Sequence, residues 1–215
     1  MVQNIHTKLN NTLKDKIQYH RFTSWIKSKG WNYYKYQLDV LKEFAIGKDI
    51  LVVAPTGAGK TIAGFLPSII DLTDNKKINK LHTVYISPLK SLAYDIERNL
   101  RIPFKELNLN ISLDIRTGDT SSYKKKMLLK FPPNLLITTP ESFALMMSYK
   151  DSRDYFACVK CFIIDELHNI IHTKRGDLLS LNISRLQTFA PDCNKIALSA
   201  SIKDKKNALE YISNE

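Results

Sequence analysis

The sequence lacks an apolar run long enough to cross a membrane. Its apolar runs at 50–54 and 162–164 are far shorter than the ~20 residues that a membrane-spanning helix needs. The polar N-terminus also lacks the apolar core of a secretory signal peptide. We therefore expect a cytoplasmic protein with no membrane partner.

Cysteine is scarce, with three in 215 residues. Cys158 and Cys161 form a C-x2-C pair, but the sequence offers no second pair of ligands to complete a zinc site. Residues three apart on a strand also face opposite sides of the sheet. We therefore predict free, buried thiols rather than a metal site or a disulfide framework.

Acidic residues are few beside the basic ones, 21 against 32, which gives a net charge of +11. Such a charge favours a polyanionic partner. Lysine outnumbers arginine 25 to 7, however, and codon bias in an AT-rich coding sequence produces this skew without selection for binding. The charge alone does not decide for nucleic acid, and we interpret Lys124–Lys126 as a solvated helix face.

Short apolar runs alternate with stretches of helical pattern, and no internal repeat occurs. This alternation is typical of βαβ units and predicts an α/β fold, a mostly parallel sheet with helices on both faces. We interpret 1–20 as an N-terminal extension, 21–46 as a helical segment and 47–215 as one domain. The predicted strands lie at 49–54, 82–87, 111–116, 134–138, 160–165 and 195–199, and the predicted helices at 8–20, 60–72, 89–100, 121–129, 140–148, 166–171, 177–189 and 203–213, with two short helices in 21–46 and a charged loop at 71–80.

A glycine-containing segment at 54–61 separates an apolar strand from a helix. In that position backbone N–H groups and the helix N-terminus attract phosphates, and glycines let the chain approach them. Lys60 is placed to reach the β- and γ-phosphates, and the Thr61 hydroxyl to hold Mg²⁺. A plain turn is the alternative, but the flanking strand and helix favour a nucleotide loop formed by Thr56, Gly57, Ala58, Gly59, Lys60 and Thr61.

A second motif, Asp165-Glu166-Leu167-His168, follows another apolar strand. A carboxylate at a strand tip can coordinate Mg²⁺, and Glu166 is placed to orient and deprotonate an attacking water. The alternative is that the two acids merely open a helix. We expect Lys60 and both carboxylates to converge on one triphosphate at adjacent sheet tips. His168 and His172 do not form the H-E-x-x-H pattern of a zinc site, so we expect His168 to link the nucleotide site to its neighbours.

Together these motifs resemble those of superfamily 2 DEXH-box helicases. Residues 54–61 resemble motif I, although Ala54 replaces the usual first glycine, and 165–168 resemble motif II. The segments 87–92, 116–120 and 138–142 resemble three nucleic-acid motifs, and with 174–179 they indicate the Lhr-type branch, nearest to the ligase-associated DNA helicases. The likeness covers roughly residues 20–212, with the motifs in family order.

The resemblance implies a first RecA-like P-loop NTPase lobe of an ATP-driven DNA helicase, with ATP and Mg²⁺ as cofactors. Single-stranded or duplex DNA is the implied partner, with RNA as an alternative. The strand-binding residues implied are Ser87, Lys90, Arg116, Thr117, Thr139 and Glu141, with further contacts or a hinge at Lys174 and Arg175. Helix capping is the structural alternative for Ser87 and Thr139, and it is compatible with phosphate binding.

Two further roles follow from the resemblance alone. Gln37, preceded by Trp31, Tyr34 and Tyr36, lies where the family places an adenine-reading glutamine; a surface position on an amphipathic helix is the alternative. Coupling of the ATP state to the strand is implied for His168, Ser199 and Ser201, where Ser201 replaces the usual threonine of motif III.

The sequence contains no counterpart of the family's second RecA-like lobe, which carries the arginine fingers. We therefore expect this chain alone to bind nucleotide weakly and to hydrolyse it slowly, with a separately encoded second lobe as one possible partner. The alternative function is a non-catalytic nucleic-acid- or partner-binding remnant. A small-molecule kinase is disfavoured because no acceptor site is evident and the strand-binding motifs would have no role.

Overall fold

The computed structural model of the protein describes residues 17–74 and 80–213. Within these residues, six strands form one sheet in the order β1-β6-β5-β2-β4-β3, and every neighbouring pair is parallel. The predicted α/β fold is therefore confirmed. The strands are β1 (Ile50–Val53), β2 (Thr83–Ile86), β3 (Leu113–Arg116), β4 (Leu135–Thr138), β5 (Cys161–Ile164) and β6 (Asn194–Ser199).

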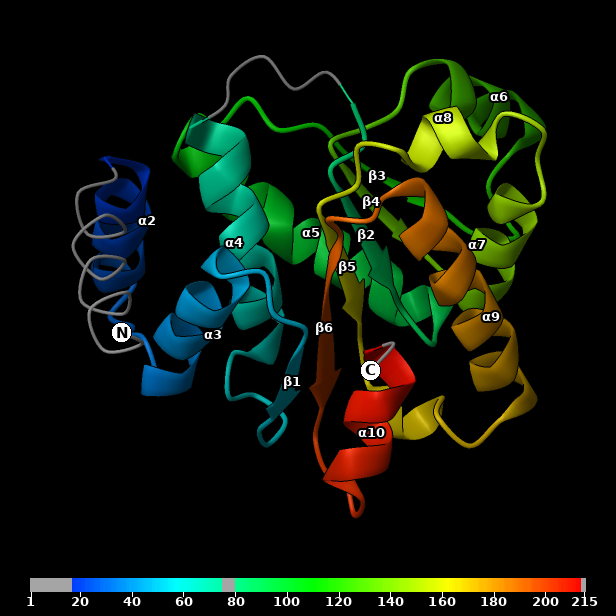
Figure 1. Cartoon of the computed structure of the whole chain (residues 1–215). Helices are drawn as coiled ribbons and strands as arrows, with labels where there is room; N and C mark the ends of the chain where they lie inside the picture. The colour runs from blue at the N-terminus through cyan, green and yellow to red at the C-terminus, as the bar shows by residue number, and fades with distance from the viewer. Residues whose placement is uncertain (1–16, 75–79, 214–215) are drawn as a thin grey trace.

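Helices cover both faces of the sheet (Figure 1). Strand β5 shows why, because Cys161 and Ile163 enter one apolar core while Phe162 and Ile164 enter the other. The first core is covered by α2 (Ile17–Ser28), α3 (Lys35–Ala45), α4 (Lys60–Asp74) and α5 (Lys90–Glu106). The second is covered by α7 (Pro140–Met147), α8 (Ser152–Phe156), α9 (Lys174–Phe189) and α10 (Lys205–Ile212), while α6 (Ser122–Lys130) follows strand β3.

Strand β6 corrects one expectation. It lies between β1 and β5, pairing Ile196 with Ile50 on one side and with Ile163 on the other. The tips that carry Lys60 and the two carboxylates are therefore not adjacent but are separated by one strand. Because all the strands are parallel, the three tips still share the carboxyl edge of the sheet.

Several helices differ from their predicted lengths. Helix α5 continues to Glu106, past Pro103, because Phe104 is buried in the first core. Only a 3₁₀ turn at Leu167–Asn169 replaces the helix predicted at 166–171, since Glu166 takes a left-handed conformation that breaks the helical run. Helix α9 begins at Lys174 rather than 177, because Thr173 caps it, and α8 was not predicted. The predicted helix at 8–20 lies mostly outside the described residues, as do 75–79 of the predicted loop, whose first residues belong to α4.

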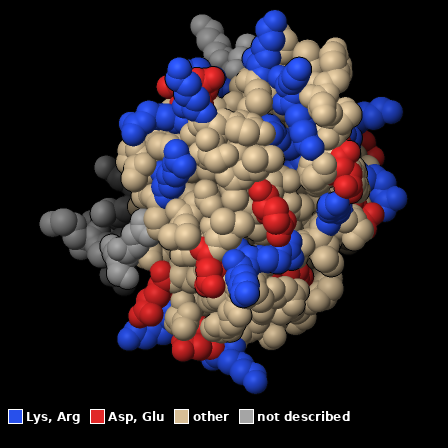
Figure 2. Space-filling view, turned by 90° about the vertical axis from the view of Figure 1, so that its right-hand side faces the viewer, with Lys and Arg blue, Asp and Glu red and all other residues tan. Residues whose placement is uncertain are grey.

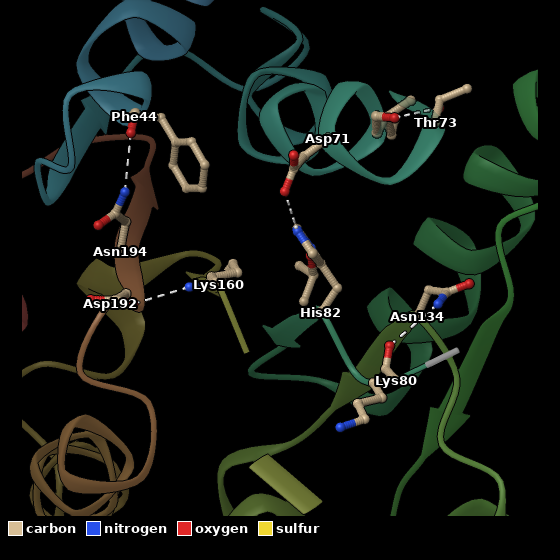
Figure 3. Close-up of polar contacts among 11 residues, drawn as sticks. Phe44, Asp71, Thr73, Lys80, His82, Asn134, Lys160, Asp192 and Asn194 are labelled. Atoms are coloured by element: carbon tan, nitrogen blue, oxygen red, sulfur yellow. Dashed lines mark hydrogen bonds and ion pairs between the residues drawn. The ribbon is translucent and has the colours of Figure 1, made fainter. Parts of the chain in front are cut away.

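Polar contacts join the elements at the amino edge of the sheet (Figure 3). Asp71 of α4 accepts from the buried His82 at 2.8 Å, and Lys160 pairs with Asp192 at 3.2 Å. Asn194 donates to the backbone carbonyl of Phe44 at 3.1 Å. These contacts hold neighbouring elements together at the amino edge, and the predicted functional residues lie at the carboxyl edge. No helix in 17–74 or 80–213 has the length and apolar character to traverse a bilayer.

Candidate functional site

The loop after β1 folds around the ammonium group of Lys60. Gly57 and Gly59 take φ angles of 81° and 77°, which residues with a side chain rarely adopt. Lys60 begins α4 and is 7% exposed, and its Nζ donates to Ala54 O at 2.9 Å and to Pro55 O at 3.1 Å. Both acceptors are neutral carbonyls, so an anion entering the loop offers this ammonium a stronger partner.

Helix α3 holds the same loop from the other side. The Tyr36 hydroxyl donates to Ala58 O, and Gln37 Nε2 donates to Gly59 O at 3.0 Å. Gln37 Oε1 accepts from the backbone N–H of Tyr34 at 2.9 Å. Gln37 is buried, so a surface position is wrong. Its amide is already bonded to backbone on both sides, and reading of adenine by this residue stays a prediction.

The two predicted catalytic carboxylates follow β5. Asp165 is 4% exposed, and its Oδ1 accepts from the backbone N–H of Glu166 at 2.9 Å. Burial raises the pKa of Asp165 above its ordinary value; the neighbouring Tyr85 phenol lowers that pKa by less, the Glu166 carboxylate raises it, and the Glu166 backbone N–H and Lys60 lower it slightly. Glu166 takes φ 46° and ψ 50°, a left-handed conformation that costs energy for a non-glycine residue and is often found at functional sites.

Lys60 and both carboxylates line one cavity of about 660 Å³. Its polar wall comes from the loop and β5, and its apolar wall from α2 and α5, including Phe22 and Trp25. A second cavity of about 570 Å³ is bounded by Tyr34 and Gln37 and shares Gly57 and Gly59 with the first. The side chains expected to converge therefore do face one space. The polar wall consists of Thr56, Gly57, Gly59, Lys60, Thr61, Asp165 and Glu166.

These residues fit a divalent cation held partly by phosphate oxygens. Asp165 and Thr61 supply oxygens, and among the described residues the buried Glu166 Oε2 has no hydrogen-bond donor. Mg²⁺ is usually bound by one or two carboxylates together with phosphates and water. The described part of the chain has no cluster of three or more His, Cys, Asp or Glu side chains, so the His168–His172 and Cys158–Cys161 pairs gain no further ligand there. The three cysteines are free thiols as expected, but only Cys161 and Cys193 are buried; Cys158 is partly exposed, which corrects the prediction that its thiol is buried.

The predicted coupling residues meet beside the acidic pair. His168 Nδ1 lies 2.9 Å from Ser199 Oγ, and that hydroxyl donates to Ser201 O at 2.8 Å. Since the Ser199 hydroxyl donates its hydrogen to the Ser201 carbonyl, its oxygen accepts a hydrogen bond from His168 Nδ1–H. His168 Nδ1 is also 3.4 Å from Glu166 Oε2. The contacts thus connect the tip of β5 to the tip of β6.

The predicted strand-binding residues lie at the tips of β2, β4 and β3, but most of their side chains are engaged or buried. Lys90 pairs with Asp119 at 2.7 Å, and Glu141 pairs with Arg175 at 2.5 Å. Ser87 Oγ donates to Leu89 O and does not cap α5, whereas Thr139 caps α7 by accepting from the Ser142 N–H. The capping alternative therefore holds for Thr139 and not for Ser87.

Arg116 and Thr117 are buried beneath this surface. Arg116 is 1% exposed, and its Nη2 donates to the Tyr149 hydroxyl at 2.6 Å. Within the described part of the chain, Arg116 Nη1 and the Thr117 hydroxyl have no hydrogen-bond partner. Their predicted contact with a strand stays a prediction, and it requires a rearrangement that exposes them.

Basic side chains do not form one continuous patch on the face shown in Figure 2, where Lys and Arg are scattered among Asp and Glu. Of the Lys124–Lys126 run, Lys124 pairs with Asp114 and Lys125 donates to Gly118 O. The scattered charge on this face adds no support for a nucleic-acid surface there.

Sequence reasoning missed four residues that shape these sites. Tyr36 stands directly before Gln37, so its place in the motif was a usable signal. Tyr85 lies in a strand predicted to be buried, and its phenol pKa is raised well above the ordinary value by burial and then by Asp165 beside it. Asp119 lies in the segment 116–120 that resembles a nucleic-acid motif, so its place was also a usable signal, whereas Tyr149 carried none because its partner Arg116 is distant in the chain.

Comparison of the sequence with known proteins identifies the family of the chain. The sequence model described as "DEAD/DEAH box helicase" matches residues 34–209. The chain is 34% identical over 203 residues to the ATP-dependent helicase Lhr-Core of Methanothermobacter thermautotrophicus, covering 88% of this chain and 24% of that protein. It is 37% identical to Lhr-Core of Sulfolobus acidocaldarius, covering 97% and 25%.

A solved structure agrees. The helicase Lhr of Mycobacterium smegmatis, bound to ssDNA and AMP-PNP, superposes with a TM-score of 0.79 at 33% identity, covering 88% of this chain and 25% of that one. The chain thus spans about a quarter of the length of these relatives. The Lhr-type likeness and the RecA-like lobe are confirmed, while the placement nearest the ligase-associated helicases stays a prediction. The chain belongs to the DEAD/DEAH box helicase family.

Proposed function

We propose that this chain is the ATP-binding lobe of an ATP-dependent DNA helicase. The observation that carries the proposal is the convergence of Lys60, Thr61, Asp165 and Glu166 on one cavity at the carboxyl edge of a parallel sheet. In this proposal 47–215 is the RecA-like domain, and 21–46 contributes the adenine side through Gln37.

Each residue of the cavity has a distinct part in the proposed reaction. Lys60 exchanges the carbonyls of Ala54 and Pro55 for oxygens of the β- and γ-phosphates. Thr61 and Asp165 would hold Mg²⁺, which would supply neutralisation of the charge that develops on the phosphates. Glu166 orients the attacking water and takes its proton through Oε2, the oxygen without a hydrogen-bond donor among the described residues.

The tips of β2, β4 and β3 are the proposed nucleic-acid surface. Backbone N–H groups at the starts of α5 and α7 can bind phosphates without reading sequence. DNA is the proposed partner because the Lhr relative was solved with ssDNA, and it is preferred to RNA on that ground. A second RecA-like lobe is the proposed partner for turnover, since related phosphoryl-transfer sites gain ~10³–10⁵ from an arginine finger.

Replacement of Lys60 tests the nucleotide site. We expect Lys60→Ala to weaken binding of a fluorescent ATP analogue about 10-fold to 100-fold, because a charge-assisted contact to phosphate is lost. Lys203→Ala removes the same charge from an exposed position outside the cavity, and should bind as the unmodified chain does. Equal affinity of Lys60→Ala and the unmodified chain would refute the ATP-binding proposal and leave a non-catalytic binding module.

A further inference from the structure

The side chain of Arg175 connects three elements at the proposed strand-binding surface. Its Nε donates to Glu141 Oε1 at 2.5 Å and its Nη2 to Glu141 Oε2 at 3.3 Å. The same Nη2 donates to Pro88 O at 2.9 Å. One guanidinium thus joins the first turn of α9 to the first turn of α7 and to the segment that leads into α5.

The turn that carries Arg175 is held from several sides. Thr173 Oγ1 caps it by accepting from Gly176 N–H at 3.2 Å. A Cβ on Gly176 would lie 2.2 Å from Ile170 O, so only glycine permits this approach of the two segments. Tyr211 of α10 donates to Gly176 O at 2.6 Å. Arg175 therefore projects from a fixed base, and its direction is determined before any ligand arrives.

The negative charge of Glu141 would repel a phosphate at this surface, and the positive charge of Arg175 offsets that repulsion. Its carboxylate lies at the start of α7, two residues after Thr139, on the surface where we propose that phosphates bind. Burial works to raise the pKa of Glu141, but the hydrogen bond and charge of Arg175 prevail and hold that pKa below its ordinary value. The group is therefore ionised at neutral pH, and only a neighbouring cation can cancel the repulsion between it and a phosphate.

The exposure of the pair indicates that its main role is not stability. The side chains of Arg175 and Glu141 are 40% and 53% exposed, and ion pairs this exposed typically contribute only ~0–1 kcal/mol. The geometry nevertheless involves two of the three guanidinium nitrogens, Nε and Nη2, and a backbone carbonyl as one acceptor, which fixes the orientation of the group.

We propose that Arg175 is a positioning residue for nucleic-acid binding: it aligns the starts of α5 and α7 and neutralises Glu141, so that a single-stranded phosphate backbone can lie across both. The proposal rests on the strand-binding role proposed above. It makes specific the further contact or hinge role that the resemblance implied for Arg175, because the effect of this residue passes through Glu141 and Pro88 rather than through a phosphate.

The test compares charge variants of the full chain in their binding to a fluorescently labelled single-stranded DNA oligonucleotide, measured by anisotropy at several salt concentrations. We expect Arg175→Ala to weaken binding about tenfold, because it leaves Glu141 uncompensated beside the strand. The double variant Arg175→Ala/Glu141→Gln removes both charges, and we expect it to recover most of the affinity and the original salt dependence. Arg175→Lys keeps the positive charge but cannot contact both Glu141 oxygens through two nitrogens, so its DNA affinity should lie between that of Arg175→Ala and that of the unmodified chain.

Three controls separate positioning from other causes. Arg185→Ala removes the same charge from the far part of α9 and should bind within about twofold of the unmodified chain. The ATP-analogue affinity and thermal midpoint of Arg175→Ala should be nearly unchanged, since the exposed pair contributes little to folding.

Two results would overturn the inference while leaving strand binding intact. One is that Arg175→Ala binds DNA as the unmodified chain does. The other is that the double variant stays as weak as Arg175→Ala, which would mean that Arg175 or Glu141 contacts the strand directly. If the unmodified chain itself shows no saturable binding to the oligonucleotide, the proposed strand surface fails and this inference fails with it.

Discussion

Individual residues in this chain differ sharply in how far burial suppresses their chemistry, and the three cysteines illustrate it. Burial raises the pKa of the Cys161 thiol to about 12 and also raises that of Cys193, whereas Cys158 is partly exposed near the end of α8. Because the thiolate is the reactive form, we expect an alkylating reagent at pH 8 to label Cys158 alone in the folded chain, and all three cysteines after unfolding. Mass spectrometry of the labelled chain gives the positions.

The pH dependence has a definite sign. Cys161 stays protonated as the pH is raised until the pH approaches about 12, because burial raises the pKa of its thiol. A Cys158→Ser variant should therefore take up no label when folded. Fast labelling of Cys161 or Cys193 in the folded chain would show that the core opens more readily than their burial indicates.

Residues of the nucleotide site could be predicted one by one, and those of the strand surface could not. Lys60, Asp165 and Glu166 each follow an apolar strand, so local order alone places them at the carboxyl edge. Arg116 has the same local context, yet its guanidinium is buried beneath Tyr149, 33 positions away in sequence. A motif predicts that a residue lies at the end of a strand. The direction of its side chain depends on residues that are far away in the sequence.

At the scale of elements, strand positions were predictable to within about two residues, and helix ends were less so. Apolar runs in a sheet covered on both faces are continuous, which makes strands easy to find. The end of α5 was misplaced because Pro103 normally terminates a helix, and here the packing of Phe104 into the core overrides that preference. Tertiary burial was the missing information.

A buried ion pair connects β6 to the residue that precedes β1. Lys195 Nζ lies 2.8 Å from Asp49 Oδ2, with side chains 5% and 19% exposed, and Asp49 Oδ1 also accepts from the Lys195 N–H. We expect Asp49→Ala to lower the free energy of unfolding by about 3–5 kcal/mol, because it leaves the buried Lys195 ammonium without a charged partner. Urea denaturation measures this change.

The chain offers a matched control for that experiment. Asp192→Ala breaks the exposed pair with Lys160 shown in Figure 3, and we expect it to cost only ~0–1 kcal/mol. Adding Lys195→Met to Asp49→Ala should recover most of the lost stability, since no charge is then buried. Equal effects of Asp49→Ala and Asp192→Ala would contradict the assignment of a buried, essential pair.

At the scale of the whole molecule, strand order divides the carboxyl edge into two halves. The nucleotide cavity is lined by the loop after β1 and by the tip of β5, with β6 between these two strands in the sheet, and the tips of β2, β4 and β3 form the proposed strand surface. This order could not be predicted from the sequence, because periodicity identifies strands but not their neighbours. Because β6 lies between β1 and β5, Ser199 at its tip stands between the two segments proposed to bind nucleotide, and its Oγ lies 2.9 Å from His168 Nδ1.

If this contact couples the two halves, its removal must uncouple nucleotide and strand binding without abolishing either. We expect saturating single-stranded DNA to tighten binding of the ATP analogue by about fivefold or more, and by reciprocity the analogue must tighten DNA binding by the same factor. Ser199→Ala removes the hydroxyl that joins His168 to Ser201 and should bring both factors close to 1. Ser201→Thr is the control, because the contact uses the carbonyl of Ser201 and not its side chain, and it should leave the factors unchanged. If DNA still tightens analogue binding in Ser199→Ala by the same factor as in the unmodified chain, the coupling does not pass through this hydroxyl. The residues that couple the two sites would then lie elsewhere along the carboxyl edge.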